Sequence, residues 1–363
     1  DRLESKGSHL FNFVDSFVVH EGETPLLRLV EQLRGDGDLS KVPNLVYKQD
    51  GEVKVNRPFA KEELNALPTP DFDGLPLDLY LSPERVLPVM GSRGCYWEQC
   101  AFCSIPFDHM TFHVRYAENV VNDFKTLQEK YNCNNFFFTD EALPINFLRT
   151  FAAKIIEQRV DVQWTGELKF EKSLLKDDRM DLLYKSGCRK LIFGLESYNQ
   201  RVLDSMKKGV ELSWVDETAE RCMKLGIAMH FYLICGFPTE TREEVMDSIN
   251  FVLDNQRLLD SPGFSAILSQ FDLERGAPIE NAPAEWGISN LHTPPEHDLS
   301  LGYSYETSIG MNAEEVNELY QQLIEKLGRE VMTFPHNYSL SDGLLYLAHH
   351  EHHSLTERLG TLA

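Results

Sequence analysis

Short runs of hydrophobic residues alternate with amphipathic patterns between residues 86 and 272. The hydrophobic runs are rich in β-branched and aromatic residues, and they predict strands at 86–90, 134–140, 161–167, 190–196, 228–237 and 264–272. The intervening patterns predict helices near 116–131, 146–158, 173–186, 199–207, 213–225 and 241–257. Six strand-then-helix units in succession predict an α/β fold with a parallel sheet, either doubly wound or curled into a partial barrel.

Local signals support several of the predicted helix ends. Thr241 with Glu244, and Ser213 with Asp216, have the spacing of a capping box at a helix start. Gly187 and Gly226 stand where caps at the carboxyl ends of helices are expected. Parallel α/β folds bind their ligands at the carboxyl ends of the strands, so we expect the chemistry of this chain there.

The two flanks of this repeat differ from it. Residues 1–34 contain one strand-like run and one helix, and residues 35–85 are rich in Gly, Pro and Asp, with a hairpin predicted to turn at Asp50-Gly51. We therefore expect a domain remnant at 1–34, a linker with a hairpin at 35–85, the core domain at 86–275 and a mostly helical extension at 276–363. The extension contains a predicted helix near 313–330.

The charge of the chain limits the classes of partner that it can bind. The net charge is -22, from 35 basic and 57 acidic residues, which disfavours nucleic acid and anionic membrane surfaces as partners. No apolar run approaches the roughly 20 residues that span a bilayer, and no basic leader precedes an apolar segment. Seven cysteines without regular spacing argue against a disulfide framework. We predict a cytoplasmic protein.

Three of the seven cysteines, Cys95, Cys100 and Cys103, fall within nine positions after the first predicted core strand. Thiolates bind soft or borderline metals, so zinc and iron-sulfur are the candidates, and each usually takes four protein ligands. His109 or His113 could complete a zinc site. Alternatively, three cysteines on a four-iron cluster leave one iron open for a cofactor or substrate. Four histidines near the carboxyl end predict either a second metal site or a polar helix end: His349, His350, His352 and His353.

The spacing Cys95-x4-Cys100-x2-Cys103, with Phe102 before the last cysteine, resembles the radical S-adenosylmethionine (radical SAM) superfamily, in which x3 then x2 is more usual. The stretches "FFFTDEAL", "FGLESYNQRVLDSMKKG" and "FYLICGFPTET" resemble later strand ends of the same family. The resemblance implies a partial (β/α)6 TIM-like barrel at residues 86–275. It also implies a 4Fe-4S cluster held by the three cysteines, with S-adenosylmethionine on the fourth iron.

The resemblance assigns roles to particular strand ends. Asp140 or Glu141 would bind the amino group of the cofactor, and Lys208 would pair with its carboxylate. Further residues that would contact or face the cofactor are Phe102, Glu196, Gly236, Phe237 and Pro238. Glu167 is either a surface charge or a contact to the ribose or the methionine. Reductive cleavage of the cofactor would give a 5'-deoxyadenosyl radical, with electrons from an external donor such as flavodoxin or ferredoxin.

A second resemblance concerns the first segment of the chain. "FVVHEGETPLLRLVEQL" is similar to the last strand and helix of the cobalamin-binding domain that precedes many radical SAM enzymes, and "LPTPDFDGL" is similar to the linker after it. The Asp-x-His-x-x-Gly signature of that domain is absent from the sequence, and we expect a truncated cobalamin domain. This implies a cobalamin-dependent methyltransferase acting on a peptide or another natural product. The alternatives are oxidation, epimerisation or methylthiolation without cobalamin, and a non-catalytic zinc-binding protein.

The remaining residues near these motifs have two interpretations. Tyr96 and Trp97, inside the cysteine loop, either pack over the cluster or anchor the loop. Cys188, Cys222 and Cys235 lie within helix or strand patterns, so we expect them to pack in the core.

Overall fold

The computed structural model describes residues 10–35, 37–80, 84–108, 111–261, 263–293 and 300–330. The chain divides into two compact units, Asp1–Leu67 with Phe107–Thr111, and Pro68–Pro106 with Phe112–Ala363. The predictions for some histidines fall outside the described residues: His109, His349, His350, His352 and His353. In the described ranges, no helix is long and apolar enough to cross a membrane.

The described part of the first unit contains a three-stranded antiparallel sheet in the order β1-β2-β3 and the helix α2. The elements are β1 (Ser16–Val18), α2 (Glu23–Arg34), β2 (Leu45–Gln49) and β3 (Glu52–Val55). The predicted hairpin is confirmed, because β2 and β3 are joined by Asp50 and Gly51, both with positive φ, as a two-residue turn of this kind requires. Since β1 pairs with β2, the segments predicted as 1–34 and 35–85 share one sheet.

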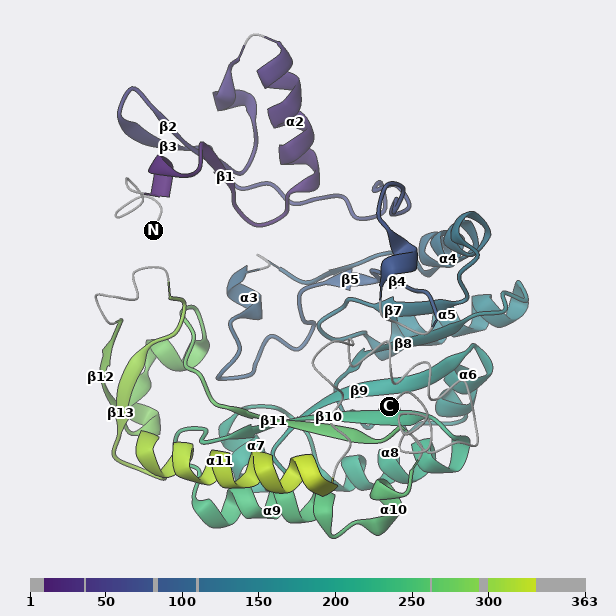
Figure 1. Ribbon diagram of the computed structural model, residues 1–363, viewed down its shortest axis with the longest axis vertical. Coiled ribbons are helices and arrows are strands. Elements are labelled where there is room, and N and C mark those ends of the chain that lie inside the picture. The colour runs from purple at the N-terminus through teal and green to yellow at the C-terminus, as the bar shows by residue number, and fades with distance from the viewer. Residues whose placement is uncertain are drawn as a thin grey trace. The chain divides into compact units, whose positions relative to one another are not determined.

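The second unit is built on a six-stranded sheet in which every neighbouring pair is parallel. Its strands are β4 (Val86–Val89), β7 (Asn135–Phe138), β8 (Gln163–Leu168), β9 (Cys188–Glu196), β10 (Ala228–Cys235) and β11 (Ser265–Gln270). They lie side by side in chain order, whereas a doubly wound sheet reverses its order part-way (Figure 1). The predicted partial (β/α)6 barrel is therefore confirmed.

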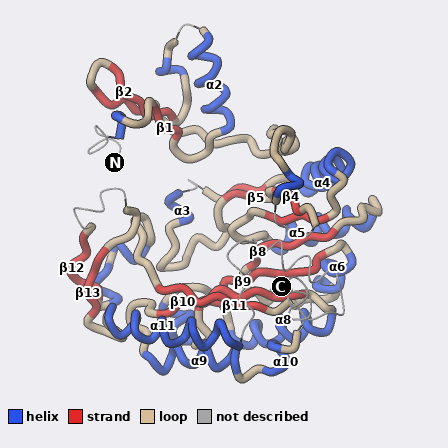
Figure 2. The backbone as a smooth tube through the Cα atoms, in the orientation of Figure 1, coloured by secondary structure: helices blue, strands red, loops and turns tan. Residues whose placement is uncertain are grey.

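Helices follow the strands and cover one face of this sheet. They are α4 (Ala117–Tyr131), α5 (Ile145–Glu157), α6 (Arg179–Lys185), α7 (Gln200–Ser205), α8 (Leu212–Leu225), α9 (Arg242–Leu253), α10 (Gln256–Leu259) and α11 (Ala313–Glu330). The helix α11 packs against β11 and α9 (Figure 2). Shorter elements are α3 (Ile105–Asp108) and two antiparallel pairs, β5 (Ser92–Arg93) with β6 (His113–Val114), and β12 (Ile288–His292) with β13 (Ser304–Thr307).

Three details of the predicted helices are wrong. The helix predicted at 173–186 begins only at Arg179, because turns precede it and Asp177 has a positive φ. The helix predicted at 241–257 is interrupted after Leu253, and the Asn255 side chain caps the short helix that follows. The helix α8 begins at Leu212, so Ser213 is not a cap.

The other capping predictions agree with the structure. Thr241 and Glu244 form both bonds of a capping box at the start of α9. Gly226 caps α8 with a positive φ of 75°, and Gly187, which follows α6, has a φ of 96°.

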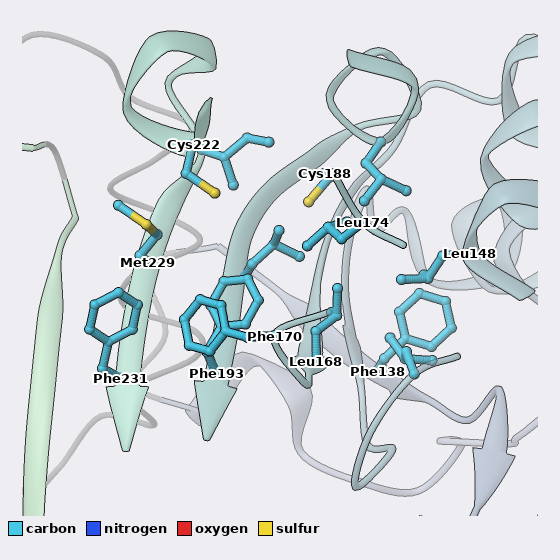
Figure 3. Packing of buried hydrophobic residues seen from close by; sticks show 14 of the residues in the cluster. Phe138, Leu148, Leu168, Phe170, Leu174, Cys188, Phe193, Cys222, Met229 and Phe231 are labelled. Carbon is cyan, nitrogen blue, oxygen red and sulfur yellow. The ribbon is translucent and has the colours of Figure 1, made fainter. Parts of the chain in front are cut away.

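The two faces of the core strands differ in polarity because successive side chains alternate between them. Toward the helices, buried residues such as Phe138, Phe193 and Phe231 form the main core (Figure 3). Three cysteines are fully buried there, which confirms their predicted packing role: Cys188, Cys222 and Cys235. The opposite face carries polar and charged side chains instead, namely Thr165, Glu167, Lys190, Glu196, His230 and Tyr232.

Candidate active site

The cysteine loop follows β4, at the carboxyl end of the first core strand. The loop contains three half-buried free thiols, those of Cys95, Cys100 and Cys103, which interact electrostatically with one another. Burial raises the pKa of Cys103 to about 12 and that of Cys100 above its ordinary value, although the nearby Lys208 acts in the opposite direction. Burial thus keeps Cys100 and Cys103 protonated unless a metal binds them.

Asp140 fixes the start of this loop. Its Oδ2 accepts a hydrogen bond of 2.9 Å from the Gly91 backbone N–H, and its Oδ1 accepts one of 2.6 Å from the Ser92 hydroxyl. The side chain is 3% exposed, and burial raises its pKa to about 6. Glu141, the other acid predicted here, is exposed and interacts electrostatically with Glu167. The structure therefore gives these two neighbouring acids different environments.

Glu196 and Lys208 form an ion pair beside the cysteines. The Lys208 Nζ lies 2.6 Å from the Glu196 Oε1, and the two side chains are only 11% and 10% exposed. Burial alone would lower the pKa of Lys208, but Glu196 and the Cys100 thiol raise it above its ordinary value. The same ammonium lies 5.6 Å from the centre of the Phe102 ring. The ion pair is thus brought next to Phe102, which stands far earlier in the sequence.

Glu167 lies on the polar face of the sheet rather than on the outer surface. Its Oε1 accepts a hydrogen bond of 3.2 Å from the Tyr232 hydroxyl. Burial raises the pKa of Glu167 to about 7, and the charges of Glu141 and Glu196 act in the same direction. Glu167 is therefore partly buried, and its contact to the cofactor stays a prediction. Tyr232 was not predicted, although it stands in the fifth predicted strand, where its polar group could have indicated the inner face.

The turn after β10 contains the predicted residues Gly236, Phe237 and Pro238. Gly236 has a φ of 85°, and a Cβ there would overlap the Val316 side chain. Phe237 is 1% exposed and packs in a cluster with Ala101 of the cysteine loop, and Pro238 is also buried. The turn and the loop therefore share one small core.

Glu240, which was not predicted, holds this turn. Its Oε2 accepts a hydrogen bond of 2.8 Å from the Gly236 N–H, while its Oε1 is buried and has no hydrogen-bond partner among the described residues. The side chain is fully buried, and burial raises its pKa to about 8. In the sequence, the sign of this role was an acid placed four residues after a glycine at the end of a predicted strand.

The aromatic pair inside the cysteine loop anchors that loop. The Tyr96 hydroxyl donates a hydrogen bond of 2.7 Å to Glu171, and the Trp97 Nε1 donates one of 2.9 Å to the Lys207 carbonyl oxygen. Lys169, at the end of β8, was not predicted; its Nζ lies 4.1 Å from the centre of a Trp97 ring. Burial lowers the pKa of Lys169.

Residues 89–252 match the family model described as the radical SAM superfamily. These residues form a radical SAM domain. An uncharacterised methyltransferase of Pyrococcus horikoshii is 30% identical to this chain over 248 residues, which are 66% of the chain and 52% of that protein. A bacteriochlorophyllide d C-12(1)-methyltransferase of Chlorobaculum tepidum is 25% identical over 50% of the chain and 40% of that protein. The chain spans about half the length of the curated relatives it matches.

Solved structures show the same fold. The radical SAM methyltransferase TsrM from Kitasatospora setae, with tryptophan and a SAM analogue bound, has a TM-score of 0.67 at 16% identity, over 96% of this chain and 76% of that one. The cobalamin-dependent radical SAM enzyme OxsB, with aqua-cobalamin bound, has a TM-score of 0.66 at 15% identity, over 88% and 52%. The family predicted from the cysteine spacing together with the motifs at the later strand ends is confirmed.

The residues of this radical SAM domain fit the 4Fe-4S cluster and S-adenosylmethionine that the family uses. The fit lies in the donor set, which combines three half-buried thiols on one loop with the buried Lys208 and Glu196. Within the described part of the chain, no three His, Cys, Asp or Glu side chains are grouped to hold a single metal ion. A four-iron cluster takes each thiolate on a different iron, so it accepts a wider spacing than a mononuclear site does.

Proposed function

We propose that this chain is the catalytic part of a cobalamin-dependent radical SAM methyltransferase. The proposal is supported by the methyltransferase relatives from Pyrococcus horikoshii and Chlorobaculum tepidum, and by the likeness of the fold to TsrM and OxsB, whose structures contain cobalamin. We also propose that the protein acts in the cytoplasm. The substrate class, a peptide or another natural product, is also proposed.

One observation carries the proposal: the three loop thiols lie beside a buried Lys208–Glu196 ion pair. The cysteines would hold the cluster, and Lys208 would attract the cofactor carboxylate, because a buried ammonium binds an anion strongly. Glu141 is the better candidate of the two acids for the cofactor amino group, because both oxygens of Asp140 already accept hydrogen bonds from the loop.

When bound, the reduced cluster and S-adenosylmethionine supply the radical and methyl chemistry, with electrons from an external donor such as flavodoxin or ferredoxin. The residues of this chain orient the cofactor and exclude water from it. A cofactor that carries a sulfonium and an ammonium group would favour the ionised form of Glu167, whose pKa burial raises to about 7, on the inner face of the sheet. The turn at Gly236 would let backbone groups approach the adenine.

Anaerobic reconstitution with iron and sulfide tests the cluster. The wild-type protein should become brown and, with reductant, should cleave S-adenosylmethionine. Cys100→Ala should lose both properties, whereas Cys133→Ala, which removes a buried thiol outside the loop, should keep them. If Cys100→Ala keeps both properties, the assignment of the loop as the cluster-binding segment is wrong.

Methyl transfer is tested separately, by adding cobalamin and candidate acceptors and following the acceptor mass. Methylthio transfer is the second candidate, because a putative methylthiotransferase of Methanocaldococcus jannaschii is 24% identical over 66% of the chain. A methylated product that forms only with cobalamin supports the proposal. A methylthiolated product, or formation of product at the same rate with and without cobalamin, contradicts it.

A further inference from the structure

Trp97 stands between Cys95 and Cys100 in the sequence, and its indole contacts Lys169, Lys207 and Gly209, which we call the Trp97 socket. Its Nε1 donates to the Lys207 carbonyl oxygen at 2.9 Å. One edge of the indole lies against Gly209, where a Cβ would overlap the ring. The Lys169 Nζ lies 4.1 Å from the centre of a ring of the indole. The loop between two cluster ligands is thus held from the ends of β8 and α7.

Lys169 is an unusual member of this socket because its charge is buried. The side chain is 6% exposed, and its Nζ donates a hydrogen bond of 2.6 Å to the Gly209 carbonyl oxygen. Among the described residues, the groups that its Nζ contacts are carbonyl oxygens and an indole ring, which are all neutral. Lys208, by contrast, is paired directly with a carboxylate. A buried ammonium without a contacting anion is costly for the fold, unless a ligand supplies the negative charge.

The groups that interact electrostatically with Lys169 are Glu171, Lys208, Cys100 and Cys95. Glu171 is the largest favourable charge among them, and its carboxylate also accepts hydrogen bonds from Tyr96 and Ser173. Cys100 and Cys95 are the next favourable groups, so these two predicted cluster ligands lie within electrostatic reach of the ammonium. A bound cluster with its thiolate ligands would add further negative charge near Lys169.

We propose that Lys169 is a positioning residue that fixes Trp97 and whose buried charge raises the reduction potential of the iron-sulfur cluster. This inference rests on the proposed function, which supplies the cluster and the external one-electron donor. When the donor gives one electron, the cluster and its thiolates become more negative by one charge. A fixed cation nearby stabilises that reduced form more than the oxidised form, and net charge near a cluster is one of the factors that set its potential.

The test is a redox titration of the reconstituted protein, followed by electron paramagnetic resonance. Lys169→Met and Lys169→Gln should keep the cluster but lower its midpoint potential, so that the ratio of reduced to oxidised cluster at the wild-type midpoint falls about tenfold, equal to about 59 mV. Lys169→Arg, which keeps the charge, should stay near the wild-type value. Lys172→Met is the matched control: it removes an exposed lysine of the same segment, whose charge water and salt screen.

The results distinguish this inference from the proposed function. If the wild-type protein takes up no cluster, the proposed function fails. If the wild type and the variants contain equal iron and sulfide, but Lys169→Met and Lys169→Gln have the wild-type midpoint potential, the inference about Lys169 is wrong. A shift in Lys169→Arg as large as that in Lys169→Met would also overturn it, because geometry rather than charge would then be the cause.

Discussion

Removing the carboxylate of Asp140 should loosen the cysteine loop at its first residues. Asp140→Ala leaves the Gly91 N–H and the Ser92 hydroxyl, both buried, without their acceptor. An unsatisfied buried donor costs about 1–3 kcal/mol, and the serine hydroxyl can rotate to reduce its share. We therefore expect Asp140→Ala to lower the free energy of unfolding by about 2–4 kcal/mol. Asp140→Asn should cost less, because its amide can accept from Gly91 and donate to the serine oxygen.

Thermal unfolding of the cluster-free protein measures this cost. Asp140→Ala should lower the midpoint temperature by at least about 4 °C, while Ser92→Ala, which removes one of the two bonds, should cost about 1 kcal/mol. After reconstitution, Asp140→Ala should also bind less iron. If its midpoint temperature and iron content equal those of the wild type, Asp140 does not hold the loop.

The pH dependence gives a second check on Asp140. Its pKa is raised to about 6 in the folded protein, against about 3.9 in an unfolded chain, so its protonated form favours folding. That contribution is fully present below pH 4 and is lost as the pH rises through about 6. The stability of the wild type relative to Asp140→Asn should therefore fall between pH 4 and pH 7. A difference that is constant across this range would contradict the burial of a titrating carboxyl group.

Three further changes test the surroundings of the loop. Lys208→Met leaves the buried Glu196 carboxylate without its partner and should cost about 3–5 kcal/mol in chemical unfolding. Glu240→Gln removes a carboxyl group whose pKa burial raises to about 8, so the protonated form favours folding and its contribution to stability is lost as the pH rises through about 8. The variant should therefore gain stability relative to the wild type between pH 5 and pH 9, which thermal unfolding would measure. Gly209→Ala, at a φ of 61°, should displace the Trp97 indole and shift its fluorescence. Gly226→Ala, at a φ of 75°, places its methyl group in open space within the described part of the chain, so it should cost only about 1 kcal/mol from the backbone.

The order of the strands could be predicted because hydrophobic runs of the right length recur with helical patterns between them. The predicted run at 190–196, for example, became β9 with only its first two residues missed. Helix starts were less predictable where no side-chain cap exists. At Glu211 the chain turns from extended to helical without a capping hydrogen bond, so Ser213 gave a misleading signal.

The contacts within the site could not be predicted, because they join residues that are far apart in sequence. Asp140 bonds residues nearly fifty positions earlier, and Trp97 bonds the Lys207 carbonyl oxygen more than a hundred positions later. A motif such as "FFFTDEAL" shows that acids follow the second core strand, but it does not show which acid turns toward the loop. That choice depends on which strand lies next to β4, and the neighbouring strand is β7.

The four-residue gap between Cys95 and Cys100 left zinc open as an alternative when only the sequence was considered. In the structure, the gap is fixed by Tyr96, which donates to Glu171, and by Trp97, whose indole contacts Lys169 and Gly209. A longer loop loses more conformational freedom when its ends are fixed, and these contacts restrict that freedom before any metal binds. We therefore expect that the additional residue does not weaken cluster binding by the loop as long as both aromatic anchors are kept.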